Sequence, residues 1–210
     1  MRIVPHDRDV KAFDQRAPGY ESGWLGQLHH DIASRAVDLA LAAAPDARRV
    51  LDVGSGTGYA LRQLAGRLPT AAELTGVDPA PEMIRVAREA ATDERLRFVE
   101  GTAEHLPAPD GAFDLVISTT SFDHWADQAA GLAECARVLA TGGQLVLTDQ
   151  VSVLLWPTLT GSRRGKARTR GRATRLITGA GLRSPQWHRL YAVIIQTATA
   201  TKWADSRATK

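Results

Sequence analysis

The chain has 210 residues, of which 44% are hydrophobic and 23% charged, a composition typical of a folded globular protein that excludes a disordered or fibrous one. Lys and Arg total 26 against 23 Asp and Glu, so the net charge is only +3 and the clustering of charge is more informative than its sum. The single cysteine, Cys135, excludes an intrachain disulfide framework and a multi-cysteine metal site, and the sequence shows neither a signal-peptide pattern nor an apolar run of transmembrane length. We therefore expect a cytoplasmic protein.

The first predicted element is a helix. Apolar residues recur at steps of three and four at Leu28, Ile32, Ala36, Leu39 and Ala43, and Pro45 closes the pattern. The preceding residues 13–26 mix aromatic residues with proline and glycine, which predicts an irregular entry loop. We interpret residues 1–45 as an N-terminal cap segment within a single domain that covers residues 1–210.

Short apolar runs then alternate with helical patterns. Strands are predicted at 49–53, 73–77, 96–99, 113–117 and 144–147, and helices at 59–68, 81–91 and 127–139. This alternation predicts an α/β fold, Rossmann-like and doubly wound, whose mostly parallel sheet is covered by helices on both faces. Two further strands at 186–190 and 191–199 predict an antiparallel C-terminal hairpin, which completes a seven-stranded sheet.

The segment 150–182, between the fifth strand and this hairpin, changes in composition. Its first part, 154–161, is short and predicts a small lid on the substrate side of the domain. Seven basic residues and no acidic one follow: Arg163, Arg164, Lys166, Arg168, Arg170, Arg172 and Arg175. On a helix Arg164, Arg168, Arg172 and Arg175 would align, either to hold nucleic-acid phosphates or an anionic substrate, or as a solvated face.

The most informative stretch is VLDVGSGTGYAL, residues 50–61. Gly54, Gly56 and Gly58 lie between a predicted strand and a predicted helix, where an open α/β sheet binds a nucleotide. Glycine permits a sharp turn and a close approach of ligand to backbone. Asp78 follows at the end of the second strand, where a carboxylate can accept hydrogen bonds from both ribose hydroxyls. This pattern predicts an adenosine-type cofactor.

The glycine spacing is G-x-G-x-G and not the G-x-G-x-x-G of dinucleotide sites, and acidic Asp52 precedes it, which suits a ligand with a cationic amine. VLDVGSGTG, GVDPAPEMI, FVEGTAEHLPAPDGAFDLVIS and RVLATGGQLVL follow in order. Together these blocks resemble the class I S-adenosylmethionine-dependent methyltransferases, particularly the small-molecule type that includes the ubiquinone and menaquinone methyltransferases. The resemblance covers about residues 13 to 149, and it implies S-adenosylmethionine as cofactor, with S-adenosylhomocysteine as product.

The resemblance also implies a set of cofactor-binding residues. The methionine part would be surrounded by Asp52, Gly54, Ser55 and Gly56, and the ribose hydroxyls would be bound by Asp78. The adenine would lie against Pro79, Thr102, Ala103 and Glu104, and the sulfonium side would be lined by Ser118 and Thr119. Phe13 and Tyr20 would close over the cofactor. Thr102 departs from the aspartate common in the family, which puts a side-chain hydrogen bond to the adenine amine in doubt and leaves the backbone N–H groups of Ala103 and Glu104 as donors.

Methyl transfer from a sulfonium is an in-line displacement, so positioning and water exclusion supply much of the catalysis. The segment STTSFDHWAD follows the fourth strand; within it His124 is a candidate base, Asp123 would orient it, and Phe122 and Trp125 would line an apolar pocket or anchor the loop. His29 and His30 lack the spacing of a helical metal pair, so we expect no metal site, with one of the two solvated and one facing the pocket.

We therefore predict an enzyme that transfers a methyl group to an oxygen, nitrogen or carbon atom of a small molecule. Three alternatives stay open. The acceptor is RNA, held by residues 163–175; or the chain is a nicotinamide-dependent reductase, which the glycine spacing disfavours; or it is a non-catalytic protein that keeps the cofactor-binding fold.

Overall fold

The computed structural model describes residues 5–152, 154, 166, 169–191 and 194–203. Its seven strands are β1 (Arg49–Val53), β2 (Glu73–Asp78), β3 (Leu96–Glu100), β4 (Phe113–Thr119), β5 (Leu139–Gln150), β6 (Leu182–Tyr191) and β7 (Ile195–Lys202). The helices are α1 (Pro5–Arg16), α2 (Gly23–Ala43), α3 (Tyr59–Arg67), α4 (Pro81–Ala90), α5 (Gln128–Val138) and α6 (Arg170–Gly179), with short 3-10 helices η1 (Ala17–Gly19) and η2 (Phe122–His124).

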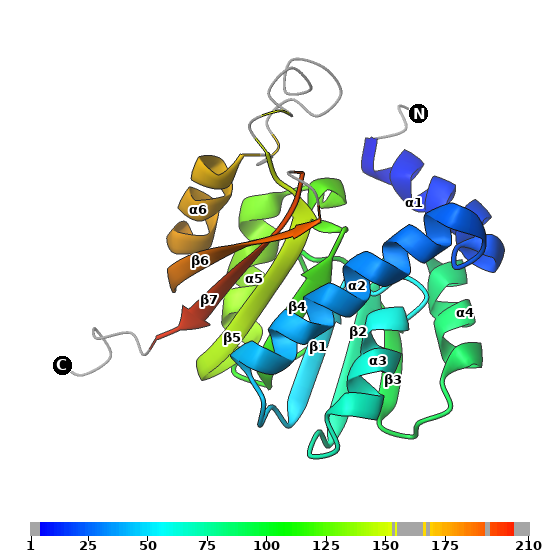
Figure 1. Cartoon of the computed structure of the whole chain (residues 1–210), viewed down its shortest axis with the longest axis horizontal. Helices are drawn as coiled ribbons and strands as arrows, with labels where there is room; N and C mark the ends of the chain where they lie inside the picture. The colour runs from blue at the N-terminus through cyan, green and yellow to red at the C-terminus, as the bar shows by residue number, and fades with distance from the viewer. Residues whose placement is uncertain (1–4, 153, 155–165, 167–168, 192–193, 204–210) are drawn as a thin grey trace.

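The strands form one sheet in the order β3-β2-β1-β4-β5-β7-β6 (Figure 1). Strands β1 to β5 pair in parallel, and β7 pairs antiparallel with both β5 and β6. The direction of the strand order reverses between β1 and β4, which is the topological switch point where open α/β sheets bind ligands beyond the carboxyl ends of the strands. The predicted doubly wound, mostly parallel sheet with an antiparallel C-terminal hairpin is confirmed.

Neighbouring residues of each central strand face opposite cores. Val50 packs with Leu61 and Leu64 of α3 on one face, whereas Leu51 packs with Leu132 and Cys135 of α5 on the other. Helices α2, α3 and α4 therefore cover one face and α5 and α6 the other, as Figure 1 shows for α2, α3 and α5. Burial on both faces explains the continuous apolar runs by which these strands are recognisable.

The structure corrects the prediction of an irregular loop over residues 13–26. Helix α1 extends to Arg16, η1 follows, and α2 begins at Gly23, five residues before the first apolar residue of the predicted helix. Proline is compatible with the first positions of a helix, and Pro18 occupies such a position in η1. Proline and glycine here mark short breaks between helices that fold back over the sheet edge.

Two strand boundaries also differ from the predictions. Strand β5 begins at Leu139, which pairs with Phe113, so the turn-like glycines 142 and 143 lie within a strand whose register shifts. In the hairpin, Tyr191 ends β6 and Ile195 begins β7, and these two residues pair. The second hairpin strand thus starts four residues later than predicted, because an apolar run alone does not locate the turn.

Much of the predicted basic ladder lies outside the described residues, including Arg163, Arg164 and Arg168, as does the predicted lid from residue 155 on. Within the described part, α6 begins at Arg170 and carries Arg172 and Arg175. No helix among the described residues has the length and apolar character needed to cross a bilayer.

Candidate cofactor-binding site

The glycine loop connects the end of β1 to the start of α3, and its three glycines have positive φ angles of 75°, 52° and 80° at positions 54, 56 and 58. A Cβ on Gly54 would lie 2.3 Å from Ser121 Oγ, and one on Gly58 would lie 2.5 Å from the Phe98 ring. A Cβ on Gly56 would meet no atom within 4 Å, because this residue faces an open pocket. The outer glycines therefore permit close packing, and the middle one presents bare backbone to a ligand.

Asp78 at the end of β2 fixes this loop. Its Oδ2 accepts a hydrogen bond from the Gly56 N–H at 2.8 Å, and its Oδ1 accepts one from the Ala80 N–H at 2.9 Å. Burial raises the pKa of Asp78, although both backbone hydrogen bonds oppose the shift. Each carboxylate oxygen keeps a second lone pair for a ligand hydroxyl, so the loop contact and ribose recognition are compatible.

A pocket with about 720 Å³ of open space lies over the carboxyl ends of the parallel strands, and we call it the outer lobe. Twelve residues singled out in the sequence line it: Phe13, Tyr20, Gly54, Gly56, Asp78, Pro79, Thr102, Ala103, Glu104, Thr119, His124 and Trp125. Residues that sequence reasoning did not single out also contribute, namely Val10, Ala80, Met83, Gly101, Thr120 and Ser121. Their positions depend on the folding back of α1 and on the turn after β4, which no local pattern announces.

A second pocket, the inner lobe, adjoins the first and shares Tyr20, Gly54, Gly56, Thr119 and Thr120 with it. Asp52 and Ser55 line the inner lobe, as predicted for the methionine end of the cofactor, together with both His29 and His30. The expectation that one histidine would be solvated is therefore wrong, since the early start of α2 brings both over the pocket.

The inner lobe contains buried polar atoms that no protein group satisfies. Asp52 is only 2% exposed and its Oδ1 has no hydrogen-bond partner; neither have Ser55 Oγ and His29 Nδ1. Burial, with a smaller contribution from the charge of Asp78, raises the pKa of Asp52 to about 8. A buried acceptor without a donor is costly, so this arrangement fits a ligand that brings a cationic N–H group, as the amino-acid end of S-adenosylmethionine does.

Aromatic side chains from the cap segment cover the junction of the two lobes. The Tyr20 ring stacks on His29 with centroids 5.1 Å apart, and Phe13 meets His124 edge-to-face at 5.1 Å. Burial raises the pKa of Tyr20 to about 12, so its hydroxyl stays protonated at neutral pH. The predicted closure of Phe13 and Tyr20 over the pocket agrees with these positions.

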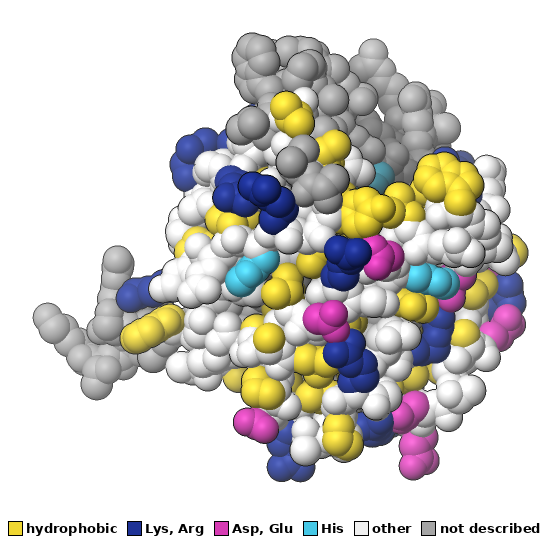
Figure 2. All heavy atoms as spheres, in the orientation of Figure 1, with side chains coloured by type: hydrophobic (Ala, Val, Ile, Leu, Met, Phe, Trp, Pro, Cys, Tyr) yellow, Lys and Arg dark blue, Asp and Glu magenta, His cyan; other side chains and the backbone are white. Residues whose placement is uncertain are grey.

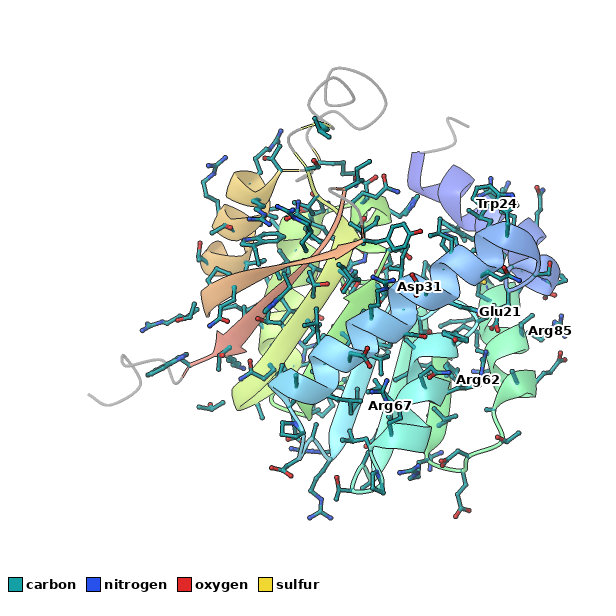
Figure 3. All side chains as sticks on the ribbon, in the orientation of Figure 1. Glu21, Trp24, Asp31, Arg62, Arg67 and Arg85 are labelled. Carbon is teal, nitrogen blue, oxygen red and sulfur yellow. The ribbon has the colours of Figure 1, made fainter. Side chains whose placement is uncertain are left out.

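An ion pair fastens this cap to the glycine-loop helix. Glu21 Oε1 lies 2.7 Å from Nη2 of Arg62 in α3, and Arg62 Nη1 also donates to the Thr57 carbonyl at 2.5 Å. Figure 3 shows Glu21 and Arg62 close to one another between α2 and α3. Sequence reasoning missed both residues, because a pair 41 positions apart has no signature in the sequence.

Three predicted site residues do not line either lobe. Ser118 is fully buried and its Oγ lies 2.7 Å from Ser121 Oγ, which in turn donates to the Val53 carbonyl at 2.8 Å. Phe122 belongs to the core, and Asp123 is buried in η2 with its backbone N–H bonded to Asp149 Oδ2 at 3.0 Å. Direct cofactor contact by Ser118 and orientation of His124 by Asp123 stay predictions.

The glycine loop, the acidic residue at the end of β2, the two-lobed pocket and the switch-point position agree with the resemblance of the sequence to class I S-adenosylmethionine-dependent methyltransferases. Residues 51–147, just under half of the chain, match the family described as "Methyltransferase domain".

Among its relatives, the demethylmenaquinone methyltransferase of Thermus thermophilus is 47% identical over 117 residues, which are 55% of this chain and 52% of the relative. The malonyl-[acyl-carrier protein] O-methyltransferase of Geobacter sulfurreducens is 41% identical over 134 residues, 63% of this chain and 49% of the relative. The chain spans about half the length of these curated relatives.

A solved Haloferax volcanii methyltransferase, in complex with the Trm112 activator, shares the fold with a TM-score of 0.77 and 22% identity; the match covers 95% of this chain and 98% of that one.

Proposed function

We propose that the chain transfers the methyl group of S-adenosylmethionine to an oxygen, nitrogen or carbon atom of a small-molecule acceptor. The observation that carries this proposal is the inner lobe, where the unsatisfied Asp52 carboxylate lies beside bare glycine backbone and Asp78 stands at the entrance to the outer lobe. An amino acid joined to a nucleoside matches both halves of this pocket.

Different residues would bind different parts of the cofactor. Asp52 and Ser55 would hold the ammonium end, Asp78 the ribose hydroxyls, and the segment Thr102 to Glu104 the adenine. Glu104 Oε1 accepts a hydrogen bond from the Asp127 N–H at 2.9 Å, which keeps this segment in place. When bound, the cofactor supplies an electrophilic methyl group on a positively charged sulfur.

The protein's own contribution is positioning and exclusion of water. Phe13 and Tyr20 cover the pocket, and Trp125 closes its far wall through a hydrogen bond from Nε1 to Ser121 Oγ at 3.2 Å. His124 faces the outer lobe, where it can accept a proton from an acceptor hydroxyl. Positioning of this kind can provide most of the rate enhancement of a displacement reaction.

The acceptor class draws support from the relatives. One relative is named for demethylmenaquinone and another for a malonyl group on acyl-carrier protein, both low-molecular-weight acceptor groups. The basic segment is the observation behind the RNA alternative; its described Lys166 donates a hydrogen bond to the Trp125 carbonyl, which supports a role for residues 150–182 on the substrate side. A cytoplasmic location stays part of the proposal, in keeping with the single buried Cys135.

Calorimetric titration with S-adenosylmethionine, S-adenosylhomocysteine and NADPH tests the proposal. The wild-type chain is expected to bind both sulfur nucleotides and not NADPH. Asp78→Ala should weaken S-adenosylhomocysteine about 100-fold or more, because the ribose contacts and the fixed position of Gly56 are lost together.

The matched control is Asp46→Ala, an exposed aspartate in the turn after α2, at the opposite end of β1 from the glycine loop. This variant should bind as the wild type does. Equal affinity of the Asp78→Ala and Asp46→Ala variants, with circular dichroism spectra unchanged, would contradict the assignment of the ribose site.

A further inference from the structure

A third cavity, which we call the lateral groove, opens from the outer lobe toward the protein surface. It shares Phe13, Tyr20, Thr120 and His124 with the outer lobe and continues between α2 and the paired ends of β6 and β7 at Tyr191 and Ile195. The groove thus begins at the candidate base and leads away from the cofactor-binding residues. This is the path that an acceptor would follow.

The walls of the groove are largely apolar. Leu25, Leu28 and Ile32 contribute one face of α2 at spacings of three and four residues, and Tyr191 and Ile195 lie among the opposite lining residues. Leu25 is 48% exposed and Tyr191 38% exposed, so the rim of the groove presents apolar surface to solvent. An apolar ligand would cover both.

Among the described residues, the lining of the groove contains one arginine, Arg16, and no Asp or Glu. Arg16 is also close enough to Tyr20 to lower its pKa against the larger effect of burial.

Figure 2 shows where basic and apolar side chains lie on the visible face. Lys and Arg side chains (dark blue) gather over α6, and apolar side chains (yellow) are exposed toward the N-terminal end of α2. A ligand in the lateral groove would therefore meet apolar walls and the Arg16 side chain.

We propose that the lateral groove binds an elongated, apolar acceptor that carries a negative charge, such as an aliphatic or aryl carboxylate or an acidic enol or phenol. The inference rests on the proposed function and adds the chemical class of its acceptor. The apolar body lies along α2, and the negative charge is balanced by Arg16 of the lining.

The test uses decanoate and decylammonium, which have the same chain and opposite charge, titrated below their micellar concentrations into the protein saturated with S-adenosylhomocysteine. Decanoate should bind at one site, about tenfold or more tighter than decylammonium. Shortening the carboxylate by two carbons should weaken binding by up to about 15-fold, because two fewer methylene groups are removed from water.

Two pairs of variants locate the binding. Leu25→Ser should weaken decanoate about fivefold, whereas Trp24→Ser, 76% exposed and outside the groove lining, should not change it. Arg16→Gln should reduce the preference for decanoate over decylammonium, and Lys11→Gln, an exposed position on the same helix, should leave it intact. Trp24 is marked in Figure 3 near the start of α2.

Binding of S-adenosylhomocysteine to each variant separates the two proposals. If the wild type does not bind S-adenosylhomocysteine, the proposed function fails. If S-adenosylhomocysteine binds but decylammonium binds as tightly as decanoate, or Leu25→Ser and Trp24→Ser are indistinguishable, the function stands and the assignment of the lateral groove is wrong.

Discussion

Asp52 is the residue whose environment departs most from that of an ordinary aspartate. Its carboxylate is buried beside Asp78, with one oxygen unsatisfied, and its pKa is raised from 3.8 to about 8. In the unfolded chain this group loses its proton near pH 4, whereas the folded chain keeps it up to about pH 8. Folding stability from Asp52 is therefore fully present below about pH 4 and is lost as the pH rises to about 8.

Asp52→Asn should remove this pH dependence, because the amide has nearly the same shape and does not ionise. We expect the Tm of the cofactor-free variant, measured relative to the wild type, to be several degrees higher at pH 8 than at pH 5. Thermal unfolding at both pH values measures the gain. A constant difference in Tm between the two proteins would show that Asp52 is ionised throughout.

The same variant should lose affinity for S-adenosylmethionine, so stability and binding would change in opposite directions at pH 8. A purely structural residue would not separate these two effects. Binding sites typically contain residues that lower the free energy of unfolding but are needed to bind the ligand.

At the residue scale the sequence was sufficient to predict Gly54, Gly56 and Asp78, because turn conformation and ligand chemistry restrict such positions to one or two residue types. It was not sufficient for Glu21 or for the pocket-facing position of His30. Those depend on where α2 begins, and a glycine at position 23 is equally compatible with a loop and with a helix start.

Among the elements, the cap is the one whose attachment matters most for the site. Two ion pairs join the cap to α3: Glu21, just before α2, pairs with Arg62 at the pocket end, and Asp38 of α2 pairs with Arg67 away from it, both at 2.7 Å. Both pairs are partly exposed, so each stabilises the fold by only about 0.5 kcal/mol. Their effects on ligand binding should differ nonetheless.

We expect Arg62→Met to weaken S-adenosylhomocysteine about three- to tenfold, because Tyr20 and His29 lose their fixed position over the inner lobe. Arg67→Met removes the comparable pair and should leave the affinity unchanged. Calorimetric titration of both variants makes the comparison, and equal losses would mean that the cap does not contribute to binding. Figure 3 labels both arginines on α3.

The regular alternation of strand and helix was predictable because the pattern that stabilises the fold is visible in the sequence. Buried strands need continuous runs of apolar residues, and amphipathic helices need a stripe of apolar residues along one face. The exceptions are informative. Residues 139–143 lie in β5 despite two glycines, because Leu139 pairs with Phe113 and Gln144 pairs with Leu115, with a register shift between the two pairs. Pairing between distant segments overrides local propensity, and a single sequence does not display it.

Considered as a whole, the molecule has a divided charge: residues 1–149 carry 14 Lys or Arg and 22 Asp or Glu, and residues 150–210 carry 12 and 1, so their net charges are −8 and +11. The pocket lies over the parallel half of the sheet, and the lateral groove extends toward the basic part. A positively charged cofactor and a negatively charged acceptor would thus meet where the two parts join.

Ligand binding should stabilise the entire chain, because the pocket is built from the cap, the glycine loop and the ends of β2 and β4. At 100 times its dissociation constant, S-adenosylhomocysteine should add about 2.7 kcal/mol to the free energy of unfolding and raise Tm by about 5 to 10 °C. Thermal scanning with and without the ligand measures this. An unchanged Tm, or an equal rise with NADPH, would contradict a site specific for the sulfur nucleotide.

The most direct measurement is a crystal structure of the chain with S-adenosylhomocysteine. The account predicts the amino group beside Asp52 in the inner lobe, the ribose hydroxyls on Asp78, the adenine against Thr102 to Glu104 in the outer lobe, and the sulfur directed toward His124 and the lateral groove. Electron density for the nucleotide outside the two lobes, or an orientation that places adenine beside Asp52, would contradict it.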